Sequence, residues 1–132
     1  MKKSFMYLIL FILPFVACEK VEYAKFSSSI IGEWTWLSTC GGFSGLCDTP
    51  KSEKDKINLV FTVDSICNLY HADTLSSSSR FHVYKLIYAD DPEDTMNILQ
   101  YDHMNQYFNI YDDRLYLSPV GADFGSDYKR VR

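Results

Sequence analysis

The sequence predicts an all-β protein, a single antiparallel up-and-down barrel of about eight strands. From residue 30 onward, apolar and polar residues alternate in short runs that recur at a spacing of roughly 8–14 residues, as strands do. Between these runs we find no convincing helical periodicity. Turn residues separate the runs closely, so each strand can pair with its predecessor, and closing the sheet removes its unpaired edges.

The first strand begins at Ile30, and Gly32, Trp34 and Trp36 share one of its faces. A Gly-rich loop is expected at 39–53. Further strands are expected at 56–63, 66–71, 81–88, 96–101, 107–111, 115–118 and 128–131. The expected connections are a flexible Ser-rich link at 76–79, a charged turn at 90–94, a tight turn at 112–113 and a final turn at 121–126.

The start of the chain has the pattern of an export signal. Lys2 and Lys3 precede an apolar run at 5–17, which is shorter than the roughly 20 residues of a membrane-spanning helix. The segment Phe15-Val16-Ala17-Cys18 resembles the lipobox of bacterial lipoproteins, in which a small residue precedes the cut and the thiol takes a diacylglycerol. We therefore expect a signal peptide at 1–17, a lipid-anchored tether at 18–29 with the lipid on Cys18, and one domain at 30–132.

Charge and composition exclude some classes of protein. The 13 basic and 17 acidic residues give a formal net charge of −4, and loss of Lys2 and Lys3 with the signal peptide leaves 115 residues with a net charge of −6. Such an acidic chain is a poor nucleic-acid binder, because phosphate neutralisation needs clustered Lys and Arg. The high apolar content excludes a disordered chain.

The first strand also carries a family resemblance. Ile31-Gly32-Glu33-Trp34 resembles the Gly-x-Trp signature of lipocalins. The segments 41–45 and 49–50 that follow it, the 112–117 hairpin and the 127–131 terminus are similar to those of small lipocalin-like (calycin-type) lipoproteins of Gram-negative bacteria. The resemblance implies an eight-stranded barrel in which Gly32 and Trp34 are structural, with Trp34 closing one end. It implies small-molecule binding only loosely, because fold does not fix function.

The three remaining cysteines face an oxidising compartment if the chain is exported. Cys40 and Cys47 depart from the small or polar residues usual in the resembling loop, and they flank glycines that allow close approach. We expect a Cys40–Cys47 disulfide, worth roughly 2–3 kcal/mol on the chain-entropy model. Cys67 is then a reduced, buried residue, and a bridge from Cys67 to either partner is the rival pairing.

Aromatic residues on the predicted strands are candidate ligand contacts. A barrel of eight strands is just wide enough for packed side chains or one small ligand. The aromatic residues either line a cavity or fill the interior, and the sequence leaves both interpretations open. The candidates for a cavity are Trp36, Phe61, Tyr70, Tyr84 and Tyr101.

Neither a metal site nor a catalytic site is predicted. The spacing of His71, His82 and His103 matches no known ligand pattern, and the acidic segment 90–94 lacks the ligand spacing of a calcium loop. No motif marks a nucleophile. We therefore expect no metal, no cofactor and no enzymatic activity.

Two functions from different classes remain. The first is an envelope-anchored lipocalin-like module that binds a small apolar or aromatic ligand in the barrel. The alternative is a structural or interaction lipoprotein with a filled barrel whose outer surface contacts an envelope protein. In both, the lipid on Cys18 holds the protein to a membrane, which we expect to be the outer membrane.

Overall fold

The structure of the protein, a computed structural model, describes residues 29–88 and 90–131. The predicted signal peptide at 1–17, Cys18 and the predicted tether up to residue 28 lie outside this part. Among the described residues, no helix has the length and apolar character needed to cross a membrane.

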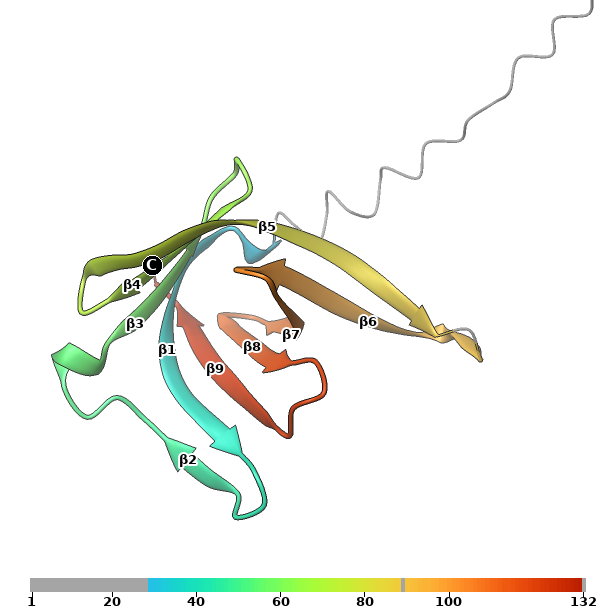
Figure 1. The fold of residues 1–132 in the computed structure, drawn as a ribbon, viewed down its shortest axis with the longest axis horizontal. Coiled ribbons are helices and arrows are strands. Elements are labelled where there is room, and N and C mark those ends of the chain that lie inside the picture. The colour runs from blue at the N-terminus through green and yellow to red at the C-terminus, as the bar shows by residue number, and fades with distance from the viewer. Residues whose placement is uncertain (1–28, 89, 132) are drawn as a thin grey trace, which may run out of the picture.

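Eight antiparallel strands form a closed barrel in up-and-down order, and a short extra strand joins its rim (Figure 1). Strand β9 returns to pair with β1, and this pairing closes the sheet. The predicted fold class is therefore confirmed. The elements are β1 (Gly32–Gly41), β2 (Leu46–Asp48), the 3-10 turn η1 (Glu53–Asp55), β3 (Ile57–Phe61), β4 (Ile66–His71), β5 (Thr74–Tyr88), β6 (Asp91–Tyr101), β7 (Met104–Tyr111), β8 (Arg114–Pro119) and β9 (Phe124–Arg130).

Trp34 and Arg130 close one end of the barrel. The Trp34 side chain is fully buried, its Nε1 donates a hydrogen bond to the Ile30 carbonyl at 2.8 Å, and the Arg130 guanidinium lies 4.0 Å from the ring centroid. Arg130 also donates to the carbonyls of Ile31 and Ser29. A Cβ on Gly32 would lie 2.7 Å from Arg130 Nη1, so the glycine leaves room for the guanidinium.

The interior next to this closed end is filled. Phe61 meets the rings of Phe81 and Tyr101 edge-on, with ring centroids 5.1 and 6.2 Å away. Rings at these separations pack well while excluding water. The buried cluster consists of Ile30, Trp34, Leu59, Phe61, Cys67, Phe81, Leu99, Tyr101, Phe108, Leu115 and Leu117.

Four predicted connections contain strand residues, and one of them is the final turn at 121–126, which holds the start of β9. The predicted loop at 39–53 contains the end of β1 and all of β2, and the predicted turn at 90–94 contains the start of β6. The predicted flexible link at 76–79 is wrong, because these serines lie inside β5 and pair with β4, for example Ser77 with Leu69. Backbone groups make this pairing, so a run without apolar side chains can still be a strand.

A β-bulge at Leu37 changes which side chains of β1 face inward. Trp36 pairs with Tyr128, but the register shift makes Thr39 the partner of Ser126. Tyr128 and Ser126 lie two residues apart on one face, so Thr39 joins Trp36 on the inner face and Cys40 turns outward.

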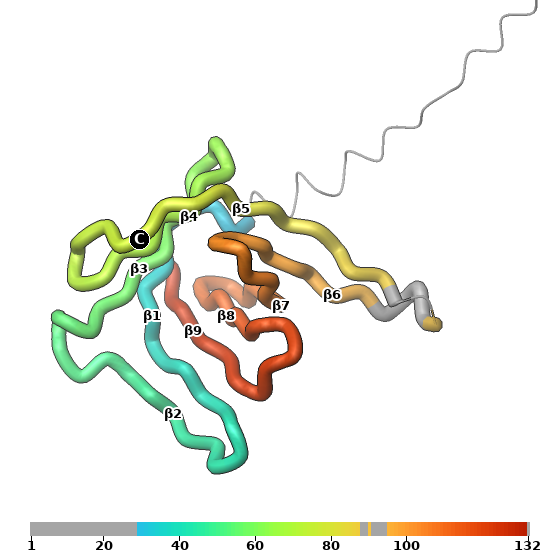
Figure 2. The backbone as a smooth tube through the Cα atoms, in the orientation of Figure 1, coloured from blue at the N-terminus to red at the C-terminus, as the bar shows by residue number. Residues whose placement is uncertain are grey.

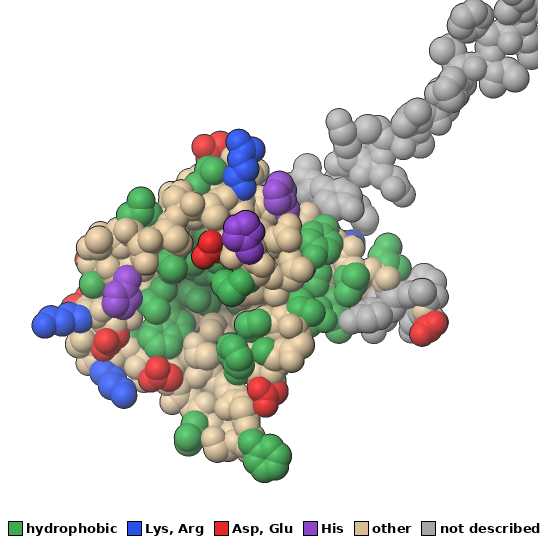
Figure 3. Space-filling model, in the orientation of Figure 1, with side chains coloured by type: hydrophobic (Ala, Val, Ile, Leu, Met, Phe, Trp, Pro, Cys, Tyr) green, Lys and Arg blue, Asp and Glu red, His purple; other side chains and the backbone are tan. Residues whose placement is uncertain are grey.

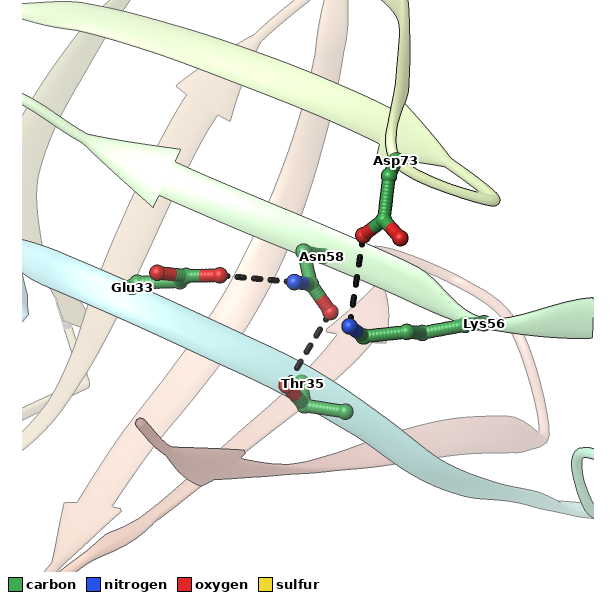
Figure 4. Close-up of polar contacts among 5 residues, drawn as sticks. All are labelled: Glu33, Thr35, Lys56, Asn58 and Asp73. Carbon is green, nitrogen blue, oxygen red and sulfur yellow. Dashed lines mark hydrogen bonds and ion pairs between the residues drawn. The ribbon is translucent and has the colours of Figure 1, made fainter. Parts of the chain in front are cut away.

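Polar contacts cross the outer face between β1 and β3 (Figure 4). Asn58 donates to Glu33 Oε1 at 2.6 Å and accepts a hydrogen bond from Thr35 Oγ1 at 3.0 Å. Nearby, Lys56 Nζ lies 3.2 Å from Asp73 Oδ1 and ties the start of β3 to the β4–β5 turn. These contacts fix the wall that supports one side of the barrel mouth.

Candidate functional site

A pocket of about 260 Å³ lies at the mouth of the barrel, opposite the closed end. The face in Figure 3 is hollowed at its centre, where apolar side chains gather between charged ones. The pocket combines two apolar side chains with four that carry ionisable groups, so it offers both apolar surface and charge. Its lining is Trp36, Asp48, Thr49, Lys51, Asp55, Ile57 and His71.

The segment after β2 supplies one wall of this pocket, and a disulfide holds the start of that wall. Cys40 and Cys47 are directly paired across β1 and β2, with an S–S bond of 2.09 Å, so the predicted disulfide is confirmed. Every side chain at 42–54 is exposed, which means that no buried apolar side chain anchors this stretch. The wall is therefore positioned by the disulfide, by the short β1–β2 ladder and by a hydrogen bond from the Gly42 amide to the Asp123 carbonyl at 3.1 Å.

The opposite wall comes from strands β3 and β4. Ile57 and His71 are direct cross-strand partners, and the Ala72 amide donates to the Lys56 carbonyl at 2.9 Å. The ion pair between Lys56 and Asp73 ties the same turn from the outside. This wall consists of paired barrel strands and is therefore rigid. The wall after β2, in contrast, depends on the Cys40–Cys47 disulfide.

Both carboxylates of the pocket are held by local hydrogen bonds. Asp48 Oδ1 accepts from the Thr49 amide at 3.1 Å. Asp55 Oδ2 accepts from the Lys51 amide at 3.2 Å and from Ser52 Oγ at 3.0 Å. Each bond uses one carboxylate oxygen and fixes the side chain, which leaves the other oxygen to face the pocket or solvent.

Trp36 contributes apolar surface rather than a hydrogen-bond donor. Its Nε1 donates to Thr39 Oγ1 at 3.0 Å, and Thr39 Oγ1 lies 2.6 Å from Ser126 Oγ. The indole N–H is thus satisfied within the barrel wall, and what remains for a ligand is the ring.

The structure separates the five aromatic residues that the sequence groups as ligand contacts. Only Trp36 lines the mouth pocket. Phe61 and Tyr101 belong to the filled core, where Tyr101 Oη accepts from Gln106 Nε2 at 3.1 Å. The interior is therefore filled beside the closed end and hollow at the mouth.

The other two candidates lie on the outer face of the barrel. Tyr70 pairs with Asn58, whose side chain makes the outer polar contacts, and Tyr84 pairs with Ile98, one position out of phase with the inward-facing Val83. Both residues differ from the expectation that they line a cavity. Simple strand alternation turns both side chains outward.

Four polar or charged pocket residues were not identified from the sequence as a site: Asp48, Thr49, Lys51 and Asp55. They lie in or next to the segment that the sequence predicts as a loop, and the sequence presents His71 only as a candidate metal ligand. The Cys40–Cys47 pairing was the one clue that this loop is held in place. Within 29–88 and 90–131, no three or more metal-binding side chains come together.

Three weakly acidic groups lie near one another in the filled part of the barrel interior. Burial raises the pKa of the Cys67 thiol to about 12, and the Asp102 carboxylate adds to this rise. Burial likewise raises the pKa of Tyr128 to about 12 and that of Tyr101 well above its ordinary value. All three are protonated at neutral pH, so the core carries no charge from these groups. Cys67 is the free, buried thiol that the sequence predicts.

These raised pKa values predict a loss of stability at alkaline pH. The folded chain keeps protons on Cys67 and Tyr128 that the unfolded chain releases at lower pH, so the stabilisation is complete below about pH 9 and is lost as pH rises toward 12. Urea unfolding midpoints between pH 7 and pH 11 measure this loss. We expect Cys67→Ala to be less stable than the wild type at pH 7. Between pH 7 and pH 11, however, the stability of this variant should fall less steeply than that of the wild type. Equal slopes would contradict the assignment to Cys67.

The sequence has no significant match among protein-family models or curated proteins. The geometry of the barrel and its mouth therefore carries the functional argument.

Proposed function

We propose that this protein is a lipid-anchored envelope lipoprotein with a lipocalin-like barrel that binds a small ligand at its mouth. The observation that carries the proposal is the pocket of about 260 Å³ above a filled core. Ligand sites in proteins are concave, mostly apolar and supplied with a few polar groups, and most hold roughly 300–1,000 Å³. At about 260 Å³ this pocket lies just below that range, which favours a ligand of few atoms.

The lipocalin-like assignment has two supports. The barrel is closed, antiparallel and eight-stranded, and the Gly32-Glu33-Trp34 motif lies at the start of its first strand. Trp34 lies at the closed end, which is the structural role that the resemblance implies for it. The described residues offer no arrangement that we assign to catalysis, and we propose a binding role rather than an enzymatic one.

Ligand binding at the mouth can be tested with a neutral probe. The chain has two tryptophans, so 5-fluorotryptophan labelling of the full-length protein in detergent micelles gives two ¹⁹F resonances. We expect 2-phenylethanol to shift the Trp36 resonance saturably and to leave that of the buried Trp34 unchanged. Ile57→Asn should weaken this response, because it replaces apolar lining with a polar group. The proposal fails if the probe moves neither resonance, or moves both equally.

The lipid anchor is tested at Cys18. The proposal rests on the charged start, the apolar run and the Ala17-Cys18 junction. Cells fed radiolabelled palmitate should label the wild-type protein and Cys67→Ala, but not Cys18→Ala, whose precursor should also remain largely uncut. Label on the Cys18→Ala protein would rule out this anchor.

An interaction role is the second candidate, favoured by apolar residues on the outer face. The β5–β6 hairpin projects from the barrel, as the chain path in Figure 2 shows. Leu86 and Met96 are direct cross-strand partners in this hairpin, and they are 37% and 36% exposed. Ile98 lies further along the same face but is only 2% exposed, so the surface available to a partner comes from Leu86 and Met96. If the neutral probe does not bind at the mouth, this surface becomes the leading functional candidate.

A further inference from the structure

We propose that the mouth pocket selects a small organic cation, an ammonium group carried on an apolar body. This inference rests on the proposed function and specifies the ligand class for the same pocket. The apolar body is matched by Trp36 and Ile57, and the ammonium group by the carboxylates of Asp48 and Asp55.

The fixed charges of the pocket are negative. Both carboxylates are held by hydrogen bonds from neighbouring amides, so they are oriented before a ligand arrives. Lys51 lines the same pocket, but its charge sits on a long, flexible stem at an exposed position, so it can turn toward solvent at little cost. An arriving cation thus meets two preorganised carboxylates, whereas an arriving anion meets the mobile Lys51 and the imidazole of His71.

The aromatic floor favours the same charge. The indole N–H of Trp36 is already bonded to Thr39, so the part of Trp36 that lines the pocket is apolar carbon and not a free donor. Tryptophan is the aromatic residue that attracts cations most strongly through its ring face. A ligand anion would find no indole donor here.

The charge of the whole chain acts in the same direction. The net charge is −4 for the full sequence. A net negative protein with a negatively charged cleft raises the local concentration of cations. Asp73, in the turn after His71, adds little negative potential, because Lys56 Nζ lies 3.2 Å from its carboxylate and offsets its charge.

A matched ligand series tests the selection of charge. The probes are 2-phenylethylamine, 2-phenylethanol and 3-phenylpropionate, which share a phenyl ring and differ in the charge of the end group. The readout is again the ¹⁹F resonance of Trp36 in the full-length protein, with Trp34 as the internal reference. We expect the amine to bind at least about fivefold more tightly than the alcohol, and the acid to bind more weakly than the alcohol. Raising the salt concentration should weaken the amine and leave the alcohol unchanged.

Substitutions distinguish the effect of the two pocket carboxylates on amine affinity from the effect of negative charge elsewhere on the protein. Asp48→Asn and Asp55→Asn keep an oxygen that can accept the local hydrogen bonds, and each should reduce amine affinity about three- to tenfold without changing alcohol affinity. The matched control is Asp112→Asn, an exposed turn residue at φ 53° where asparagine is equally tolerated. It should leave the affinity for the amine unchanged.

The outcomes distinguish the two levels of the argument. If alcohol and amine bind equally, or if the acid binds best, the inference about the cation is overturned while ligand binding at the mouth stands. If Asp112→Asn weakens the amine as much as Asp48→Asn does, the effect is the general field of the chain and the inference is also overturned. If the alcohol does not shift the Trp36 resonance, the proposed function itself fails, whatever the two charged probes do.

Discussion

Replacing Trp34 by alanine is expected to destabilise the fold by about 3–5 kcal/mol, the usual cost of deleting a large aromatic side chain from a core. The side chain is fully buried, its Nε1 bonds the Ile30 carbonyl, and its ring lies under the Arg130 guanidinium. The substitution therefore leaves a cavity, an unpaired carbonyl and an arginine without its aromatic contact. Urea unfolding followed by far-ultraviolet circular dichroism measures the loss.

Trp36→Ala is the matched control for this prediction. Trp36 lies two residues away on the same strand and the same inner face, but it lines the mouth pocket, where water can replace the lost ring. We expect its cost to be at least about 1 kcal/mol lower than that of Trp34→Ala. An equal cost for both residues would mean that the closed end is not the more tightly packed part of the barrel.

Trp34 could be predicted from the sequence because the information that fixes it is local. Strand alternation places Trp34 on the inner face, and Gly32, two residues earlier, leaves room for the guanidinium that covers the indole ring. The Cys40–Cys47 disulfide was equally accessible, because a short glycine-containing turn brings the two residues together. Only Arg130, at the far end of the chain, depends on closure of the sheet.

The mouth could not be predicted, because it depends on how distant segments meet. The sequence identifies 39–53 as a loop but gives no measure of where this segment crosses the barrel. Asp48 and Asp55 therefore look like ordinary turn residues until Trp36 and Ile57 are found beside them. The bulge at Leu37 is also hidden, because simple alternation along β1 would have turned Cys40 inward.

Alternation misled in one further respect, since an apolar residue does not always mark the inner face. In the β5–β6 hairpin, Val83 and Leu99 face the core, while Tyr84 and Ile98 face outward. Both faces carry apolar residues, so the pattern alone does not tell an interior tyrosine from an outer one. The sequence pattern therefore groups Tyr84 with interior residues.

Removing the disulfide is expected to have the second large effect, on both stability and the mouth. Cys40→Ser with Cys47→Ser should cost roughly 2–3 kcal/mol of unfolding free energy, since the unfolded chain gains the freedom of an open loop. The native state is affected at the same place. No side chain at 42–54 is buried, so without the bridge this wall depends on the short β1–β2 ladder, the hydrogen bond from the Gly42 amide to the Asp123 carbonyl, and local turns.

Hydrogen exchange measured by mass spectrometry tests whether this effect is local. At pH 7 without urea, amides at 42–54 should exchange faster in the double variant than in the wild type. The exchange rates of amides in β7 and β8 should be unchanged, because the pairing of these strands does not involve the disulfide. The variant should also bind 2-phenylethanol and 2-phenylethylamine more weakly, both by a similar factor, since the wall moves while its charges remain. Cys67→Ala is the control, because it removes a buried thiol without touching the wall, and it should leave exchange at 42–54 unchanged. If the double variant exchanges at 42–54 as slowly as the wild type, the wall is held by its backbone contacts and the disulfide does not shape the mouth.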